Sequence, residues 1–194
     1  MDFLEKLETG LVENWYVWLV SLTLVIAAVI DGIKLKVPNW ITFPMIIAGW
    51  IFSCAYFAFN GEPWYDGLGL SLLGTAVGFG LLLPVYAIGG MGAGDVKLLM
   101  GVGAWMHSTT TFYAFCLSVL VGGVIAVAMV LYKKGWKKHY TQFRMILQEI
   151  LTVRDPEQLA EMAAERKSSM LLLPYGIPIA IGSVVYFAWM GMLI

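Results

Sequence analysis

Six apolar runs constrain the fold of this chain more than any other feature of its sequence. They cover approximately residues 15–30, 40–59, 68–88, 96–106, 112–132 and 170–192. A helix that crosses the hydrocarbon core of a bilayer needs about 20 mainly apolar residues. The fourth run is shorter than this even if it extends to Thr110, so it is expected to be only partly embedded in lipid. The sequence therefore predicts an all-α, polytopic membrane protein with six transmembrane helices.

Composition supports the same class of protein. Of the 194 residues, 60% are hydrophobic and 13% are charged, whereas a soluble domain is about half apolar and about a quarter charged. A large soluble catalytic domain is thus excluded. The net charge of −1 gives no basic footprint for nucleic acid. The chain is expected to form one integral-membrane domain over residues 1–194, with Cys54 and Cys116 as buried free thiols inside apolar runs.

Basic residues gather on one side of the six-helix arrangement. All of the 12 Lys and Arg residues except Lys6 fall in loops of that side. Cytoplasmic loops carry an excess of Lys and Arg. The sequence therefore predicts a multi-pass protein of the cytoplasmic (inner) membrane with both termini outside.

Residues 133–169 form the one long polar segment and are expected to lie in the cytoplasm. The segment opens with Lys-Lys-Gly-Trp-Lys-Lys-His-Tyr, a basic and aromatic pattern that suits an anionic lipid surface. Further on, Phe143, Ile146, Leu147 and Ile150 fall on one helical face. The pattern favours short amphipathic helices on the membrane surface; a solvated connector and a partner-binding loop remain alternatives. Membrane lipids are expected partners.

Two aspartates lie where a carboxylate is costly. Asp31 directly follows the first apolar run, and Asp95 lies between a glycine-rich stretch and the fourth run. The predicted topology places both at the cytoplasmic side, where packed helices can bring them together. Two adjacent carboxylates share one proton, which is the basis of aspartic proteolysis with water as the nucleophile. Each residue alone has a simpler explanation: Asp95 can cap a helix, and Asp31 can be an ordinary interfacial residue.

Five neighbouring residues are candidates for shaping this site. Gly92 and Gly94 are expected to let the backbone turn tightly and approach a substrate. Pro38 suits the first turn of the second helix, and Asn39 starts that helix or adds a polar contact. Lys97 can favour the ionised form of the nearby carboxylate, bind phosphate headgroups, or simply extend toward the interface. No His, Cys and carboxylate cluster has the spacing of metal ligands, so neither a metal nor another cofactor is expected.

The same residues resemble the motifs of a known family. Asp31-Gly-Ile-Lys-Leu-Lys-Val-Pro-Asn39 resembles the first active-site motif of the type IV prepilin peptidases, and Gly90-Met-Gly-Ala-Gly-Asp-Val-Lys97 resembles their second, Gly-x-Gly-Asp motif. Pro174-Tyr-Gly176 resembles a third, less specific signature. The family's glycine after Gly-Ala-Trp-Met is replaced by His107, which is expected to face outward and to matter little.

The resemblance implies an intramembrane aspartyl endopeptidase. Asp31 and Asp95 would be its catalytic pair, and it would remove the basic leader of prepilin-like proteins at the cytoplasmic face. The chain resembles the short branch of the family without the N-terminal methyltransferase region, so methyltransferase activity is not expected. One alternative is a proton-coupled transporter that uses the two aspartates as relays. Another is an assembly subunit of a secretion apparatus in which they are idle; the oligomeric state is left open.

Overall fold

The computed structural model describes residues 13–87, 90–132 and 174–193, and this part of the chain contains helices and no strand. The helices are α2 (Trp15–Lys34), α3 (Asn39–Phe59), α4 (Trp64–Ala87), α5 (Ala93–Tyr132) and α8 (Gly176–Trp189). The all-α prediction is confirmed for these residues. Helices α2 to α5 are long and apolar enough to cross a membrane, whereas α8 has 14 residues. The protein is thus a helical membrane protein, but six transmembrane helices are not confirmed.

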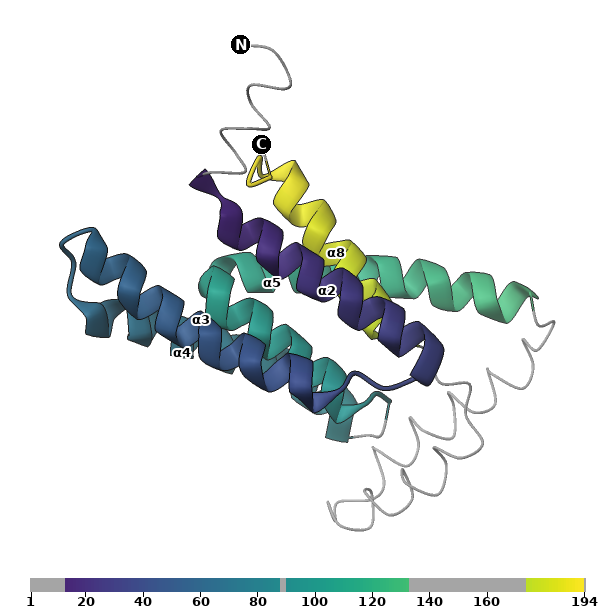
Figure 1. Ribbon diagram of the computed structural model, residues 1–194. Coiled ribbons are helices and arrows are strands. Elements are labelled where there is room, and N and C mark those ends of the chain that lie inside the picture. Colours follow the sequence, from purple (N-terminus) through teal and green to yellow (C-terminus); the bar gives the residue numbers. More distant parts are fainter. Residues whose placement is uncertain (1–12, 88–89, 133–173, 194) are drawn as a thin grey trace.

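The predicted fourth and fifth runs form the single element α5, which is interrupted at His107. The backbone there has φ 60° and ψ −175°, a conformation that is essentially confined to glycine. Two helices are joined across a kink at His107, and the two parts of α5 run in different directions (Figure 1). The boundary between the two predicted runs is therefore one sharply bent residue rather than a loop. The amphipathic segment predicted at 133–169 lies outside the described residues.

Segment 93–106 forms the centre of the bundle. Its residues Leu98, Leu99 and Val102 are fully buried. Glycines allow the neighbouring helices to approach it closely: a Cβ on Gly103 would overlap the carbonyl oxygen of Gly74 in α4. Such contacts between backbones are typical of helix packing in membranes, where small residues replace the hydrophobic driving force. The central position fixes where the first turn of this segment lies.

The helix ends define two ends of the bundle. The start of α2 and the end of α8 lie at one end (Figure 1), where Tyr16 and Met192 line a common cavity. The other end holds the end of α2 and the starts of α3, α5 and α8. Asp31 lies inside the last turns of α2 and Asp95 in the first turn of α5. Both aspartates are thereby placed at the same end, on helices that are separated in sequence.

Candidate active site

A polar pocket of about 300 Å³ lies at the end of the bundle that carries the two aspartates. Six of the seven predicted site residues line it: Asp31, Asn39, Gly92, Gly94, Asp95 and Lys97. The seventh, Pro38, is not part of the lining; its backbone is extended and it precedes α3, instead of lying in the first turn as predicted. The structure therefore brings both motifs to one pocket, as the sequence predicts, and moves one residue to its margin.

The carboxylate of Asp31 is held by the start of α8. Its Oδ2 accepts a hydrogen bond of 2.8 Å from the backbone N–H of Gly176, the first residue of that helix. The amide groups of a helix N-terminus lack partners in the helix and favour a negative charge. A Cβ on Gly176 would lie 2.9 Å from the same oxygen and 3.0 Å from the Cβ of Asp31. A larger residue at position 176 would therefore push the Asp31 side chain away from its present position.

Asp95 combines a structural contact with a place in the pocket. It is the third residue of α5, and its Oδ2 accepts a 3.1 Å hydrogen bond from the N–H of Gly92. An acidic side chain that reaches back in this way is one half of a capping box. Oδ2 of Asp95 therefore caps the start of α5, as the simpler of the two explanations for this residue predicts. The residue is only 6% exposed and lines the pocket at the same time.

Gly94 joins the loop after α2 to the start of α5. A Cβ at this position would lie 2.6 Å from the carbonyl oxygen of Val37 and 3.0 Å from its Cβ. Neither Gly92 nor Gly94 has a positive φ, so the tight turn expected of them does not depend on the conformational freedom of glycine. What requires glycine at position 94 is close packing, which draws the loop that follows Asp31 toward Asp95.

Lys97 connects α5 to α3. Its Nζ donates a hydrogen bond of 3.0 Å to Oδ1 of Asn39 and lies 4.5 Å from the centroid of the Phe43 ring, in cation–π range. Asn39 therefore both begins α3 and makes the polar contact considered for it. Both residues line the pocket, and their hydrogen bond joins α5 to α3 there.

Tyr175 and Gly176 belong to the stretch that resembles a family signature, but the sequence predicts no role for them in the site. Tyr175 lines the polar pocket, as does Met91. The last helix begins at Gly176, later than the predicted run at 170–192, and Pro174 just before it is a residue typical of helix starts. That signal could have indicated Gly176, whereas the inward orientation of Met91 has no counterpart in the sequence pattern.

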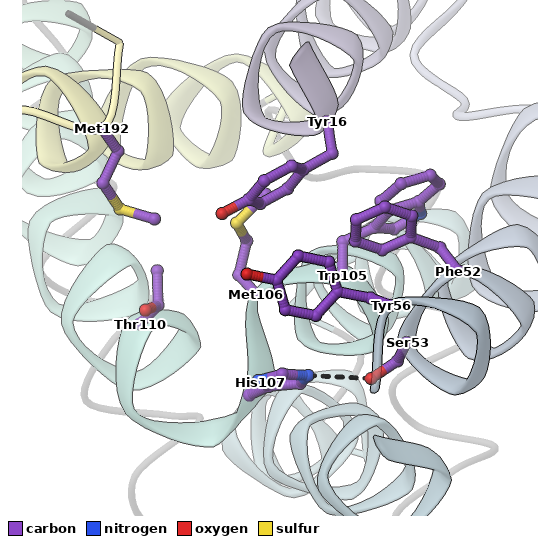
Figure 2. A pocket seen from close by; sticks show the side chains of 9 residues that line it. All are labelled: Tyr16, Phe52, Ser53, Tyr56, Trp105, Met106, His107, Thr110 and Met192. Carbon is purple, nitrogen blue, oxygen red and sulfur yellow. Dashed lines mark hydrogen bonds between the residues drawn. The ribbon is translucent and has the colours of Figure 1, made fainter. Parts of the chain in front are cut away.

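A second polar cavity, of about 230 Å³, lies at the opposite end of the bundle (Figure 2). In it the Oγ of Ser53 lies 3.0 Å from Nε2 of His107 and donates a 2.8 Å hydrogen bond to the carbonyl of Gly67. A hydroxyl has one hydrogen, so the His107 nitrogen donates to Ser53 instead of accepting its proton. The pair is therefore not an activated nucleophile. His107 is half-buried and bonded, contrary to the expectation that it matters little.

The fold and the polar pocket define a helical membrane protein with two buried carboxylates at one pocket. The chain belongs to the type IV leader peptidase family, whose model matches residues 18–127.

Three relatives illustrate the similarity, each named prepilin leader peptidase/N-methyltransferase. The protein of Bacillus subtilis (strain 168) is 35% identical over 113 residues, which are 56% of this chain and 42% of the relative. That of Aeromonas salmonicida (strain A449) is 30% identical over 120 residues, 58% of this chain and 39% of the relative. That of Neisseria gonorrhoeae is 32% identical over 119 residues, which are 58% of this chain and 37% of the relative. The chain thus spans about two fifths of the length of these relatives, and no solved structure matches it.

Proposed function

We propose that this protein is an intramembrane aspartyl endopeptidase that removes the basic leader of a prepilin-like protein. One observation carries the proposal: Asp31 of α2 and Asp95 of α5, both buried, line the same polar pocket. No other acidic or basic side chain among the described residues is buried. Membership of the leader peptidase family supports a peptide substrate.

The chemistry follows from two carboxyl groups that share one proton. The ionised group accepts a proton from a water molecule, which attacks the carbonyl carbon of the scissile bond. The protonated group donates its proton to the carbonyl oxygen. Collapse of the tetrahedral intermediate passes a proton to the leaving amine, so no covalent intermediate forms. Neither a metal nor a cofactor takes part in this scheme, and methyl transfer is not included in it.

The proposed orientation places the polar pocket at the cytoplasmic face. Lys34 and Lys36 lie three and five residues after Asp31, and Lys97 lies two residues after Asp95, so the end of the bundle that holds the pocket carries positive charges. The positive-inside rule assigns that end to the cytoplasm. A basic leader would remain in the cytoplasm while the apolar part of the substrate lies in the membrane.

Cleavage of a prepilin-like precursor by the purified, reconstituted protein tests the proposal. Asp31→Asn and Asp95→Asn should each lower kcat by about 10³-fold, the scale of acid–base catalysis by a positioned group, while the protein stays folded. Asp66→Asn is the matched control because Asp66 is exposed in the first turn of α4. Near-normal cleavage by either site variant would rule out the aspartyl mechanism.

The transporter alternative receives no specific support. A proton relay across a bilayer needs ionisable groups along its path, whereas the two buried aspartates line a single pocket at one end of the bundle. Proton uptake by proteoliposomes that depends on Asp31 and Asp95, without cleavage of any precursor, would favour the transporter over the peptidase.

A further inference from the structure

An apolar cavity adjoins the polar pocket and shares two of its lining residues. The cavity has a volume of about 330 Å³ and lies between α4, segment 108–132 of α5 and α8. Met91 and Tyr175 line both this cavity and the polar pocket. Its remaining walls are mostly apolar or small side chains, among them Leu82, Phe115 and Gly122. The two spaces therefore form one site with an acidic part and an apolar part.

Small residues recur along the α5 wall of the apolar cavity. Ser118, Gly122 and Ala126 follow one another at intervals of four, so they share one helical face, and all three line the cavity. Small residues at this spacing let a second helix approach closely inside a membrane. Helix α8 uses the first part of the row: Gly182 packs against the backbone of Ser118.

The α5 wall also has open space beside its contact with α8. A Cβ on Gly122 would meet Pro178 of α8 at 3.4 Å, whereas a Cβ on the adjacent Gly123 would meet nothing within 4 Å. Gly123 also lines the apolar cavity. Among the described residues, nothing fills the space beside Gly123, so a second helix could pack against this part of α5.

We propose that the apolar cavity binds the membrane-embedded apolar helix of the peptide substrate, directly beside the bond that is cut. The inference rests on the proposed peptidase function and assigns the substrate a binding face. Because Met91 and Tyr175 border both spaces, a helix seated at Gly123 would have its end beside the acidic pocket. A row of small residues favours a helix as the occupant, because it lets the backbone of a second helix approach closely.

A second apolar groove lies between α2 and α8 and is the rival binding face. It is larger, about 540 Å³, and is lined by residues such as Val25, Val29 and Ile181. None of its lining residues borders the polar pocket. A helix in that groove would have no shared wall to guide its end toward the aspartates.

Filling the apolar cavity tests the proposal kinetically. Gly123→Leu adds a side chain at the cavity wall, at a position where a Cβ meets nothing within 4 Å. KM for a membrane-embedded precursor should rise about tenfold with kcat little changed, as expected when ground-state binding is lost. Gly80→Leu is the matched control: Gly80 is an exposed helical glycine of α4 with nothing within 4 Å of its Cβ, and its KM should not change. Equal KM values for the two variants would overturn the proposal.

Disulfide cross-linking tests the binding face without catalysis. In a Cys54→Ala, Cys116→Ala, Asp95→Asn protein, Gly123→Cys should cross-link to a precursor that carries one cysteine in its apolar helix, and Gly80→Cys should not. Cross-linking to Ile181→Cys instead would assign the helix to the α2–α8 groove. If neither the Gly123→Cys nor the Ile181→Cys protein cross-links to the precursor, the cavity would be assigned to lipid or to other residues of this chain. Both results overturn the inference, and neither bears on cleavage by the unmodified aspartate pair.

Discussion

At the scale of single residues, His107 occupies a backbone conformation that ordinarily requires glycine. Its φ of 60° and ψ of −175° cost about 1–3 kcal/mol for a residue with a side chain. The hydrogen bond to Ser53 offsets part of that cost. The family glycine at this position, noted from the sequence, therefore has a conformational reason.

His107→Gly should be more stable than His107→Ala by about 1–3 kcal/mol. Both substitutions remove the bond to Ser53, but only glycine relieves the backbone. Inside an ordinary helix the order is reversed, with alanine more stable by about 1 kcal/mol, so the comparison isolates the backbone effect. Thermal unfolding of the two variants in the same detergent measures it. If the alanine variant were the more stable, the break at position 107 would be disproved.

Gly176→Ala should impair the site without affecting either aspartate chemically. The new methyl group would lie 2.9 Å from Oδ2 of Asp31, so the carboxylate must move or lose its bond to the backbone of α8. Precursor cleavage should fall by about tenfold or more, the cost of misplacing a catalytic group slightly. Gly32→Ala is the control, because its Cβ would meet only Ile177 at 3.4 Å. Equal loss in both variants would refute a positioning role for Gly176.

At the scale of the elements, the sequence predicts the helices well and their contacts poorly. The apolar runs at 40–59 and 68–88 correspond closely to α3 and α4. Helix α2 continues past its apolar run to Lys34, because backbone hydrogen bonds continue where hydropathy stops. The pairing of Asp31 with the start of α8 depends on the packing of helices from opposite ends of the chain, which no local pattern encodes.

Gly94→Ala tests the contact between the α2–α3 loop and the start of α5. The added methyl group would lie 2.6 Å from a backbone oxygen of Val37, and backbone cannot yield as a flexible side chain does. The loop should move away from α5, and precursor cleavage should fall more than thermal stability does. In Gly69→Ala the methyl group meets nothing within 4 Å, so both quantities should stay near normal. Unchanged cleavage by the Gly94 variant would contradict the assigned contact.

At the scale of the whole molecule, the class of protein and the gathering of the two motifs could be predicted from the sequence. Apolar run length determines the first. Asp31 follows the first run and Asp95 precedes the fourth, so alternating crossings place both motifs on the same side of the membrane. The six predicted crossings are not confirmed, because the short fourth run joins the fifth in α5 and α8 has 14 residues. A hydropathy pattern also does not predict a bend at a single residue such as His107.

Labelling of single cysteines tests the proposed orientation. In a Cys54→Ala, Cys116→Ala background, Glu62→Cys in the α3–α4 turn should react with a membrane-impermeant thiol reagent in intact cells. Lys34→Cys, at the end of the bundle that holds the polar pocket, should react only after the membrane is permeabilised. Both positions are exposed, so access to reagent depends on the side of the membrane. The opposite pattern would place the polar pocket outside and separate it from a cytoplasmic leader.

The bend at His107 also limits how far segment 93–106 can reach through a membrane. The segment spans roughly 21 Å at the rise of an α-helix, well short of the roughly 30 Å hydrocarbon thickness of a typical bilayer. Other helices of the bundle surround it, so the bilayer does not have to thin to accommodate its length. At least one end of the segment would instead lie below the lipid headgroups, where protein rather than acyl chains encloses it.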